Sequence, residues 1–109
     1  MLHDTFSALS DPTRRAIVDR LMRGPKRVTE LAAPFDMSLA AVSKHIQVLE
    51  HAGLVHRRRE GREHVLSLDA QPLREVARYA SRFEKFWNEK LDRLEAFVAT
   101  IEEKDKEKR

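Results

Sequence analysis

The fold of this protein is decided by residues 38–55, which read SLAAVSKHIQVLEHAGLV. Ser38 is a good helix N-cap and Gly53 a common helix terminator, so the stretch predicts a helix from Leu39 to about Ala52. At roughly 100° per residue, one narrow face of this helix is apolar, and we expect that face to pack into the core. It holds Leu39, Val42, Ile46 and Leu49.

The opposite face of the same helix is small and polar. The major groove of B-DNA admits a helix when the facing side chains are compact. The Gln47 amide can form two hydrogen bonds with one adenine, and Lys44 can reach a guanine or a phosphate. The free N–H groups at the helix start near Ser38 can hold a phosphate. We expect His45, at the edge of the apolar face, to pack or hydrogen-bond within the protein. The residues predicted to contact DNA from this helix are Ser38, Ala40, Ala41, Ser43, Lys44 and Gln47.

The segment before this helix supports the DNA-binding interpretation. Any one of the polar residues alone would fit a plain solvated helix face, so the prediction depends on what surrounds it. Residues 28–33 predict a short helix, and a tight connection at residues 35–37 joins it to the next one. Two short helices joined in this way make residues 28–52 a helix-turn-helix candidate.

A basic hairpin is predicted directly after the helix-turn-helix. Two β-rich runs flank the turn Glu60-Gly61-Arg62-Glu63, and together they form a wing over residues 55–68. Alternate side chains of a strand point to opposite faces, so some of the four arginines in residues 57–62 must face the domain and others the solvent. We predict that Arg62 enters a minor groove and that Arg58 contacts phosphate. Phosphate contacts add affinity but carry no sequence information.

Two further helices are predicted near the start of the chain. The first covers residues 2–9, and Ser10-Asp11-Pro12 reads as the cap and first turn of a second, from Thr13 to about Arg23. With a last long helix, the predicted order is α-α-α-α-β-β-α. The expected fold class is therefore a mainly α (α+β) winged helix-turn-helix, in a single domain over residues 1–109.

The last predicted helix, residues 71–103, would be about 50 Å long. Its apolar positions recur every seven residues and form a stripe wider than a small domain can cover, with breaks at Glu84 and Lys90. We expect a symmetric homodimer in which this helix and the helix within residues 1–10 pack against their copies. Residues 104–109 are expected to be a frayed end. The predicted dimer contacts are Leu2, Phe6, Phe83, Trp87, Leu91, Leu94, Phe97 and Val98.

The charge distribution points to a polyanion as partner. The formal net charge of +3 is confined to residues 1–68, because the acidic and basic residues of 69–109 balance. A two-fold dimer would read two half-sites about one turn of DNA apart, so the predicted partner is double-stranded DNA with an inverted repeat.

The residue types that are absent exclude several kinds of chemistry. The chain has no cysteine, which excludes disulfides, thiolate metal sites and cysteine nucleophiles. No apolar run nears the roughly 20 residues of a membrane span. We therefore expect no membrane partner, and a cytoplasmic protein that associates with the bacterial nucleoid when it is bound to DNA.

Several segments together resemble the ArsR/SmtB family of bacterial winged-helix repressors. The similarity covers about residues 5–100 and is most specific from Ser43-Lys44-His45-Ile46 through Gly53-Leu54-Val55 and the wing. The resemblance implies a homodimer, operator binding through helix 38–52 and the wing, and repression that is relieved by a signal. The sequence does not identify an inducer. The other matching segments are residues 6–15, Glu30-Leu31-Ala32 and Arg59-Glu60-Gly61-Arg62.

The metal sites known in that family have no counterpart in this sequence. The stretch matching their thiolate site is Glu30-Leu31-Ala32-Ala33-Pro34, and residues 69–109 lack the histidine of their other site. The chain thus resembles the metal-independent branch, and we expect neither a metal nor another cofactor. An unusual site built from three histidines near the hairpin stays open as an alternative. These are His51, His56 and His64.

Two other classes of function compete with a DNA-binding repressor. A winged helix can bind protein or RNA without operator specificity, but such a module has little use for a small, cationic recognition face. An enzyme is the weakest interpretation, since the sequence has no cysteine, no glycine-rich phosphate loop and no carboxylate pair in a plausible cleft. The prediction is a dimeric transcriptional repressor rather than an enzyme.

Overall fold

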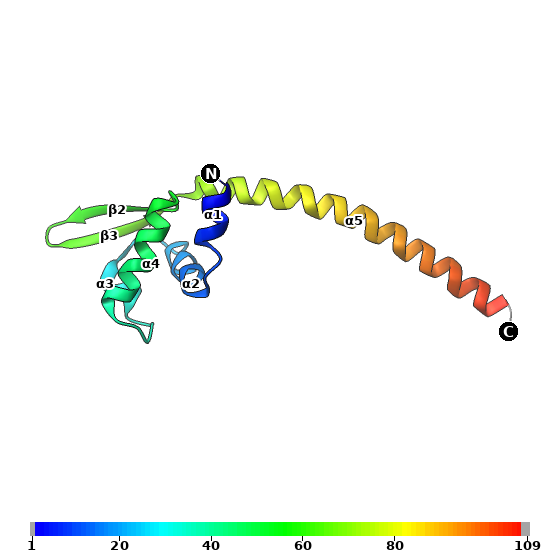
Figure 1. The fold of residues 1–109 in the computed structure, drawn as a ribbon, viewed down its shortest axis with the longest axis horizontal. Helices are drawn as coiled ribbons and strands as arrows, with labels where there is room; N and C mark the ends of the chain where they lie inside the picture. The colour runs from blue at the N-terminus through cyan, green and yellow to red at the C-terminus, as the bar shows by residue number, and fades with distance from the viewer. Residues whose placement is uncertain (1, 108–109) are drawn as a thin grey trace. The chain divides into compact units, whose positions relative to one another are not determined.

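The computed structural model describes residues 2–107 and confirms the winged helix-turn-helix fold (Figure 1). All the predicted helices and strands are present, with one additional short strand. In chain order the elements are α1 (Leu2–Ala8), α2 (Pro12–Leu21), β1 (Lys26–Arg27), α3 (Val28–Ala32), α4 (Leu39–His51), β2 (Val55–Glu60), β3 (Glu63–Leu68) and α5 (Ala70–Glu107).

The chain divides into two compact units, residues 1–76 and residues 77–109. The described residues 2–76 form what we call the body, which holds the helix-turn-helix, the sheet and the start of α5. We call residues 77–107 outer α5. Each unit is described by itself.

A three-stranded antiparallel sheet closes one side of the body, in the order β1-β3-β2. The two residues of β1 pair with Leu66 and Val65 of β3, and the sequence did not predict this strand. A two-residue strand is too short for an alternating pattern, so only its pairing partner identifies it. β2 and β3 form the predicted wing, whose tip extends past α4 in Figure 1.

α2 and α4 begin at the predicted capping residues. Asp11 caps α2, where its side chain accepts a hydrogen bond from the Arg14 backbone N–H at 3.0 Å. Ser38 caps α4 in the same way, with its hydroxyl accepting from the Ala41 backbone N–H at 3.1 Å. These caps satisfy N–H groups that a helix start otherwise leaves unpaired.

The apolar face of α4 lies in the core of the body, with one exception. Val42, Ile46 and Leu49 are fully buried, as predicted, and pack with Leu31 of α3 and Leu66 of β3, among others. Leu39 is 53% exposed, so the prediction that it faces the core was wrong. Leu39 is the first residue of α4 and follows the exposed residues 36–38, where no other element covers it.

α5 is longer than the sequence predicted. It begins at Ala70, where the Gln71 backbone N–H donates to Asp69 Oδ1 at 2.9 Å, and it continues to Glu107. Residues 104–107 are thus helical rather than frayed, and residues 108–109 lie outside the described part. The extension has a physical basis, because Glu and Lys are good helix formers and Glu102 and Lys106 stand at the favourable i, i+4 spacing.

Outer α5 has no core of its own, since every residue from 77 to 107 is exposed. Its apolar side chains nevertheless recur along one side, as the sequence predicted. None of the helices within residues 2–107 is both long enough and apolar enough to cross a membrane.

Candidate nucleic-acid interface

The outer face of α4 presents the side chains that the sequence selected for DNA contact. Ser38, Ala40, Lys44 and Gln47 are exposed, while Ala41 and Ser43 are half-buried. The side chains of Lys44 and Gln47 form no hydrogen bond or ion pair with any residue between 2 and 107. Both polar groups are therefore available to an external partner.

Ser38 lies at the start of α4, where the sequence predicted that free N–H groups could hold a phosphate. Its hydroxyl already accepts from the Ala41 N–H, and its carbonyl accepts from the Val42 N–H at 3.1 Å. A phosphate at this helix end would therefore meet the first backbone N–H groups of α4 and the positive end of the helix dipole.

A shallow groove of about 660 Å³ runs beside this face, between α1 and α4. Val48 and Ala52 of α4 and Ala8 of α1 give it an apolar lining, while Asp4, Lys44 and other polar residues line the rest. Val48 is the largest apolar residue of this lining. Its 40% exposure is explained by its place in this groove.

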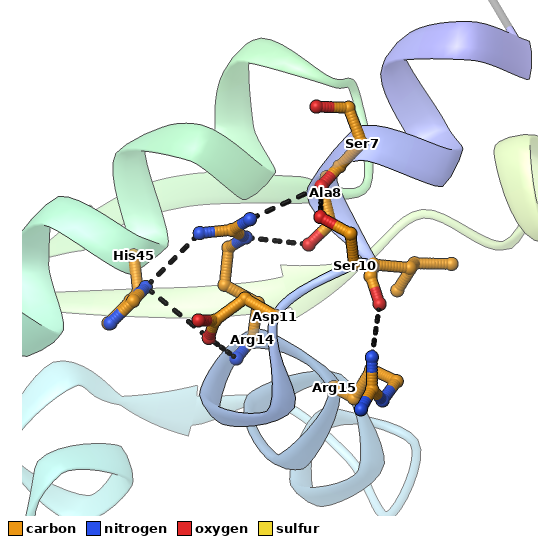
Figure 2. Close-up of polar contacts among 8 residues, drawn as sticks. Ser7, Ala8, Ser10, Asp11, Arg14, Arg15 and His45 are labelled. Carbon is orange, nitrogen blue, oxygen red and sulfur yellow. Dashed lines mark hydrogen bonds and ion pairs between the residues drawn. The ribbon is translucent and has the colours of Figure 1, made fainter.

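A polar network behind α4 fixes the positions of three helices (Figure 2). The Arg14 guanidinium donates from Nε to the Ala8 carbonyl at 2.6 Å and from Nη2 to the Ser7 carbonyl at 3.2 Å. It thereby satisfies carbonyls at the C-terminal end of α1. Arg14 Nη1 also lies 3.4 Å from His45 Nδ1, so this one side chain joins α1 and α2 to α4.

His45 has the internal role that the sequence predicted. Its ring is half-buried, and its Nδ1 lies 3.7 Å from Asp11 Oδ2 in addition to its contact with Arg14. Sequence reasoning did not identify Arg14, because no local pattern shows that an arginine in the first turn of α2 reaches back to α1. His45 and Arg14 thus join α4 to α1 and to the start of α2.

Two carboxylates of the body have lowered pKa values. The Arg14 backbone N–H stabilises the charged form of Asp11 and lowers its pKa, and the nearby His45 and Arg14 charges act in the same direction. The Gln71 backbone N–H lowers the pKa of Asp69, with a further contribution from the hydrogen bond to His56. Both groups are helix caps, so their charge stabilises the starts of α2 and α5.

The wing closes through the predicted tight turn. Glu60 pairs with Glu63 at the end of the ladder, which leaves Gly61 and Arg62 as a two-residue loop. Gly61 has a φ of +62°, whereas Arg62 does not have a positive φ. This is the pattern of a type II′ turn, which takes glycine at its first central position and matches the twist of the strands.

The four wing arginines divide as the strand alternation predicted. Arg57 faces α4 and pairs with Glu50 through an Nη2–Oε1 contact of 2.8 Å. Arg58 lies on the other face of the strand and pairs with Glu60. Arg59 Nε donates to the Gly61 carbonyl at 3.1 Å. The side chain of Arg62, at the tip, forms no hydrogen bond or ion pair with any described residue. Of the two arginines predicted to contact DNA, Arg62 is therefore unpaired, whereas Arg58 is paired with Glu60.

The structure does not bring the three histidines near the wing together. His56 Nε2 lies 2.7 Å from Asp69 Oδ2. His64 is the cross-strand partner of Arg59, so its side chain lies on the face of the hairpin that does not carry His56. His51 lines the groove beside α1. Within residues 2–107, no group of three histidine or carboxylate side chains is placed to hold a metal ion.

The residues predicted to form a dimer interface are accessible. Phe6 on α1 is exposed and Leu2 is half-buried. Those on outer α5 are all exposed, and Phe97 reaches 63%. They are Phe83, Trp87, Leu91, Leu94, Phe97 and Val98.

Comparison with known proteins agrees with this geometry. A family described as "Helix-turn-helix domain" matches residues 9–58. The chain is 43% identical to the HTH-type transcriptional regulator Rv2034 of Mycobacterium tuberculosis, covering 79% of this chain and 78% of that one. It is 30% identical to the transcriptional repressor SdpR of Bacillus subtilis, covering 75% of this chain and 91% of that one.

A solved structure is also similar. The crystal structure of an ArsR family transcriptional regulator, RHA00566, superposes with a TM-score of 0.73. That match has 40% sequence identity and covers 80% of this chain and 90% of the other.

Proposed function

This chain belongs to the ArsR/SmtB family of transcriptional regulators and is a DNA-binding repressor, and from that premise we propose how it recognises its operator. A homodimer places the two copies of α4 in successive major grooves, and the two wings contact the flanking minor grooves. The target is an inverted repeat whose half-sites lie about 34–36 Å apart, or a multiple of that distance.

The observation that carries this proposal is the outer face of α4. Ala40 lets the helix approach the base edges closely, while the side chains of Lys44 and Gln47 provide polar groups that have no partner among residues 2–107. In the proposal Gln47 reads an adenine through its amide, and Lys44 reads a guanine or contacts phosphate. Ala41 and Ser43, at the flanks, come close enough for contact with a base edge or the backbone.

The wing supplies affinity rather than sequence preference. Arg62 at the tip enters the minor groove, where a narrow A·T tract attracts a cation. Arg58 exchanges its exposed ion pair with Glu60 for a phosphate, at small cost because solvent already screens that pair. The surplus positive charge of residues 1–68 adds long-range attraction to DNA.

The dimer is supported by the exposed apolar side chains of outer α5. A monomer would leave these large apolar side chains in water, and such patches usually mark protein interfaces. A second copy removes the stripe from water and at the same time supplies the second recognition helix. We propose Leu2 and Phe6 of α1 as further contacts between the two copies.

Selection of bound fragments from genomic DNA tests the proposed function. We expect enrichment of fragments with an inverted repeat and a steep loss of affinity with rising salt. Equal retention of all fragments would contradict operator recognition, and preferential retention of RNA would favour the alternative of an RNA-binding module.

A further inference from the structure

The first turn of α4 carries a large apolar side chain that the body leaves exposed. Leu39 is 53% exposed and is not among the apolar side chains that form the core of the body or pack against it. A single exposed leucine is common on protein surfaces and by itself indicates nothing. The position is informative here, because the N-terminal residues of a recognition helix are the ones that meet base edges in the major groove.

Leu39 lies on the same side of α4 as two residues predicted to contact DNA. Ser43 and Gln47 follow it four and eight residues later, each turned by about 40° from the one before. Residues four apart are neighbours on a helix surface, so the three side chains form one row along α4. Gln47 is exposed and Ser43 half-buried. The row therefore begins with an apolar side chain and ends with an amide.

The backbone that carries Leu39 is fixed on both sides. The Ser38 hydroxyl accepts from the Ala41 N–H and the Ser38 carbonyl from the Val42 N–H, each at 3.1 Å. The Val42 side chain is fully buried in the core. A side chain on a fixed backbone has less freedom to lose on binding, which favours a specific contact over a loose one.

We propose that Leu39 contacts the C5-methyl group of a thymine in each half-site and thereby helps to determine the operator sequence. This inference rests on the proposed function, in which α4 lies in the major groove and Gln47 reads an adenine. Eight residues at about 1.5 Å each separate Leu39 from Gln47 by about 12 Å along the helix. The thymine is therefore a different base pair, about two to four pairs from the one that Gln47 reads.

The chemistry of leucine selects thymine among the four standard bases. Only thymine presents a methyl group in the major groove, where it can share an apolar contact with a protein side chain. Leucine has no donor or acceptor, so it gains free energy only by removing apolar surface from water. Against cytosine it would cover the N4 amino group without offering an acceptor, and a donor left unsatisfied is costly.

Parallel selection of sites from random double-stranded DNA with the natural chain and with Leu39→Ala locates the contact. We expect Leu39→Ala to select the same inverted repeat with the preference for thymine relaxed at one symmetric base pair. This pair should differ from the one relaxed by Gln47→Ala, because the two side chains lie at different heights on α4.

Replacement of single thymines in the selected site by deoxyuridine tests the methyl contact directly, because deoxyuridine lacks only that methyl group. At one thymine of each half-site, the natural chain should lose about fourfold in affinity, the effect expected for burial of one methyl group. Replacement in both half-sites should cost about fifteenfold. At that position Leu39→Ala should bind the thymine and deoxyuridine duplexes equally, whereas Leu39→Met, which keeps an apolar side chain of similar size, should retain the difference.

Met22→Ala is the matched control. Met22 is 61% exposed at the end of α2, so this variant shortens an exposed apolar side chain away from α4. It should respond to deoxyuridine as the natural chain does. Leu39→Ala should also keep the denaturation midpoint of the natural chain, since the residue is exposed and alanine favours a helix. A loss of affinity then reflects the missing contact rather than unfolding.

The result that would overturn the role of Leu39 is a natural chain that selects an inverted repeat but responds to deoxyuridine no more than Leu39→Ala at every thymine. That outcome would leave the proposed function intact. If the natural chain selects no inverted repeat, both the proposed function and the role of Leu39 are overturned.

Discussion

α4 and outer α5 are both helices with a long exposed face, but the two faces differ in chemistry. α4 buries Val42, Ile46 and Leu49 completely, and its exposed side carries short or polar residues. Outer α5 buries nothing, and its exposed side carries large apolar residues such as Trp87 and Phe97. The first face suits the grooves of DNA, whereas the second suits another protein surface. The contrast shows that the type of exposed side chain, rather than exposure itself, indicates the partner.

The largest difference between the two regions should appear in folding stability. Ile46 and Ile101 are the same residue type, 0% and 50% exposed respectively. Ile46→Ala should lower the free energy of unfolding of the body by about 2–5 kcal/mol, because it leaves a cavity. Ile101→Ala should change it by less than about 0.5 kcal/mol when the protein is dilute enough to be monomeric.

Chemical denaturation followed by circular dichroism at low protein concentration measures both variants. At high concentration Ile101→Ala should become destabilising, because dimerisation then contributes to stability. Equal losses for the two variants at low concentration would mean that outer α5 has a buried partner within its own chain.

The next largest effect should come from a substitution that prevents dimerisation but leaves the recognition face of α4 unchanged. Trp87→Asp places a charge in the apolar stripe and should give monomers whose affinity for an inverted repeat falls by about a hundredfold, as two linked contacts become one. Asn88→Asp makes the same change of charge on the polar side of the helix and should remain dimeric. Sedimentation and DNA titration of both variants test this, and a dimeric Trp87→Asp variant would refute the interface.

A smaller effect should distinguish α4 from the wing. Arg62→Ala should weaken binding to all sequences and reduce the slope of log affinity against log salt by about one. Arg57→Ala is the matched control, because Arg57 is already paired with Glu50 and should change the salt slope less. Fluorescence anisotropy at several salt concentrations measures the slopes. Equal slopes for the Arg62 and Arg57 variants would show that the tip has no special role.

The smallest expected effect concerns pH and is confined to the body. The pKa values of Asp11 and Asp69 are lowered in the folded state, so the unfolded state binds their protons more readily. Their contribution to stability is therefore complete above their ordinary pKa values and is lost as the pH falls below about 4. Asp11→Asn keeps a capping side chain but removes the charge, so its stability should fall less steeply between pH 5 and pH 3 than that of the natural chain. Parallel curves for the two proteins would contradict the role of the Asp11 charge.

Local signals in the sequence predicted most of the body. Ser38 and Gly53 bounded α4, Gly61 predicted the turn of the wing, and alternation predicted the division of the wing arginines. Each of these features depends on residues close together in the chain, which is why the sequence alone revealed them.

The features that the sequence missed depend on distant contacts or on the ends of elements. β1 exists only through its pairing with β3, and Arg14 acts through carbonyls of the preceding helix and through His45. Leu39 lies on the apolar face of α4 in a helical wheel, but no part of the core covers it. Residues 104–107 continue α5 although they are all polar, so no apolar periodicity predicts helix there. Periodicity indicates which face is apolar, but it does not show where the covering element stops.

Selection of binding sites from random double-stranded DNA, performed in parallel with the natural chain and with Gln47→Ala, tests the recognition of DNA by α4 most directly. We expect an inverted repeat for the natural chain. For Gln47→Ala we expect the same spacing with preference relaxed at one symmetric base pair in each half-site, at a cost of about 1–3 kcal/mol per site. A single asymmetric site, or an identical consensus for both proteins, would contradict the recognition of DNA by α4.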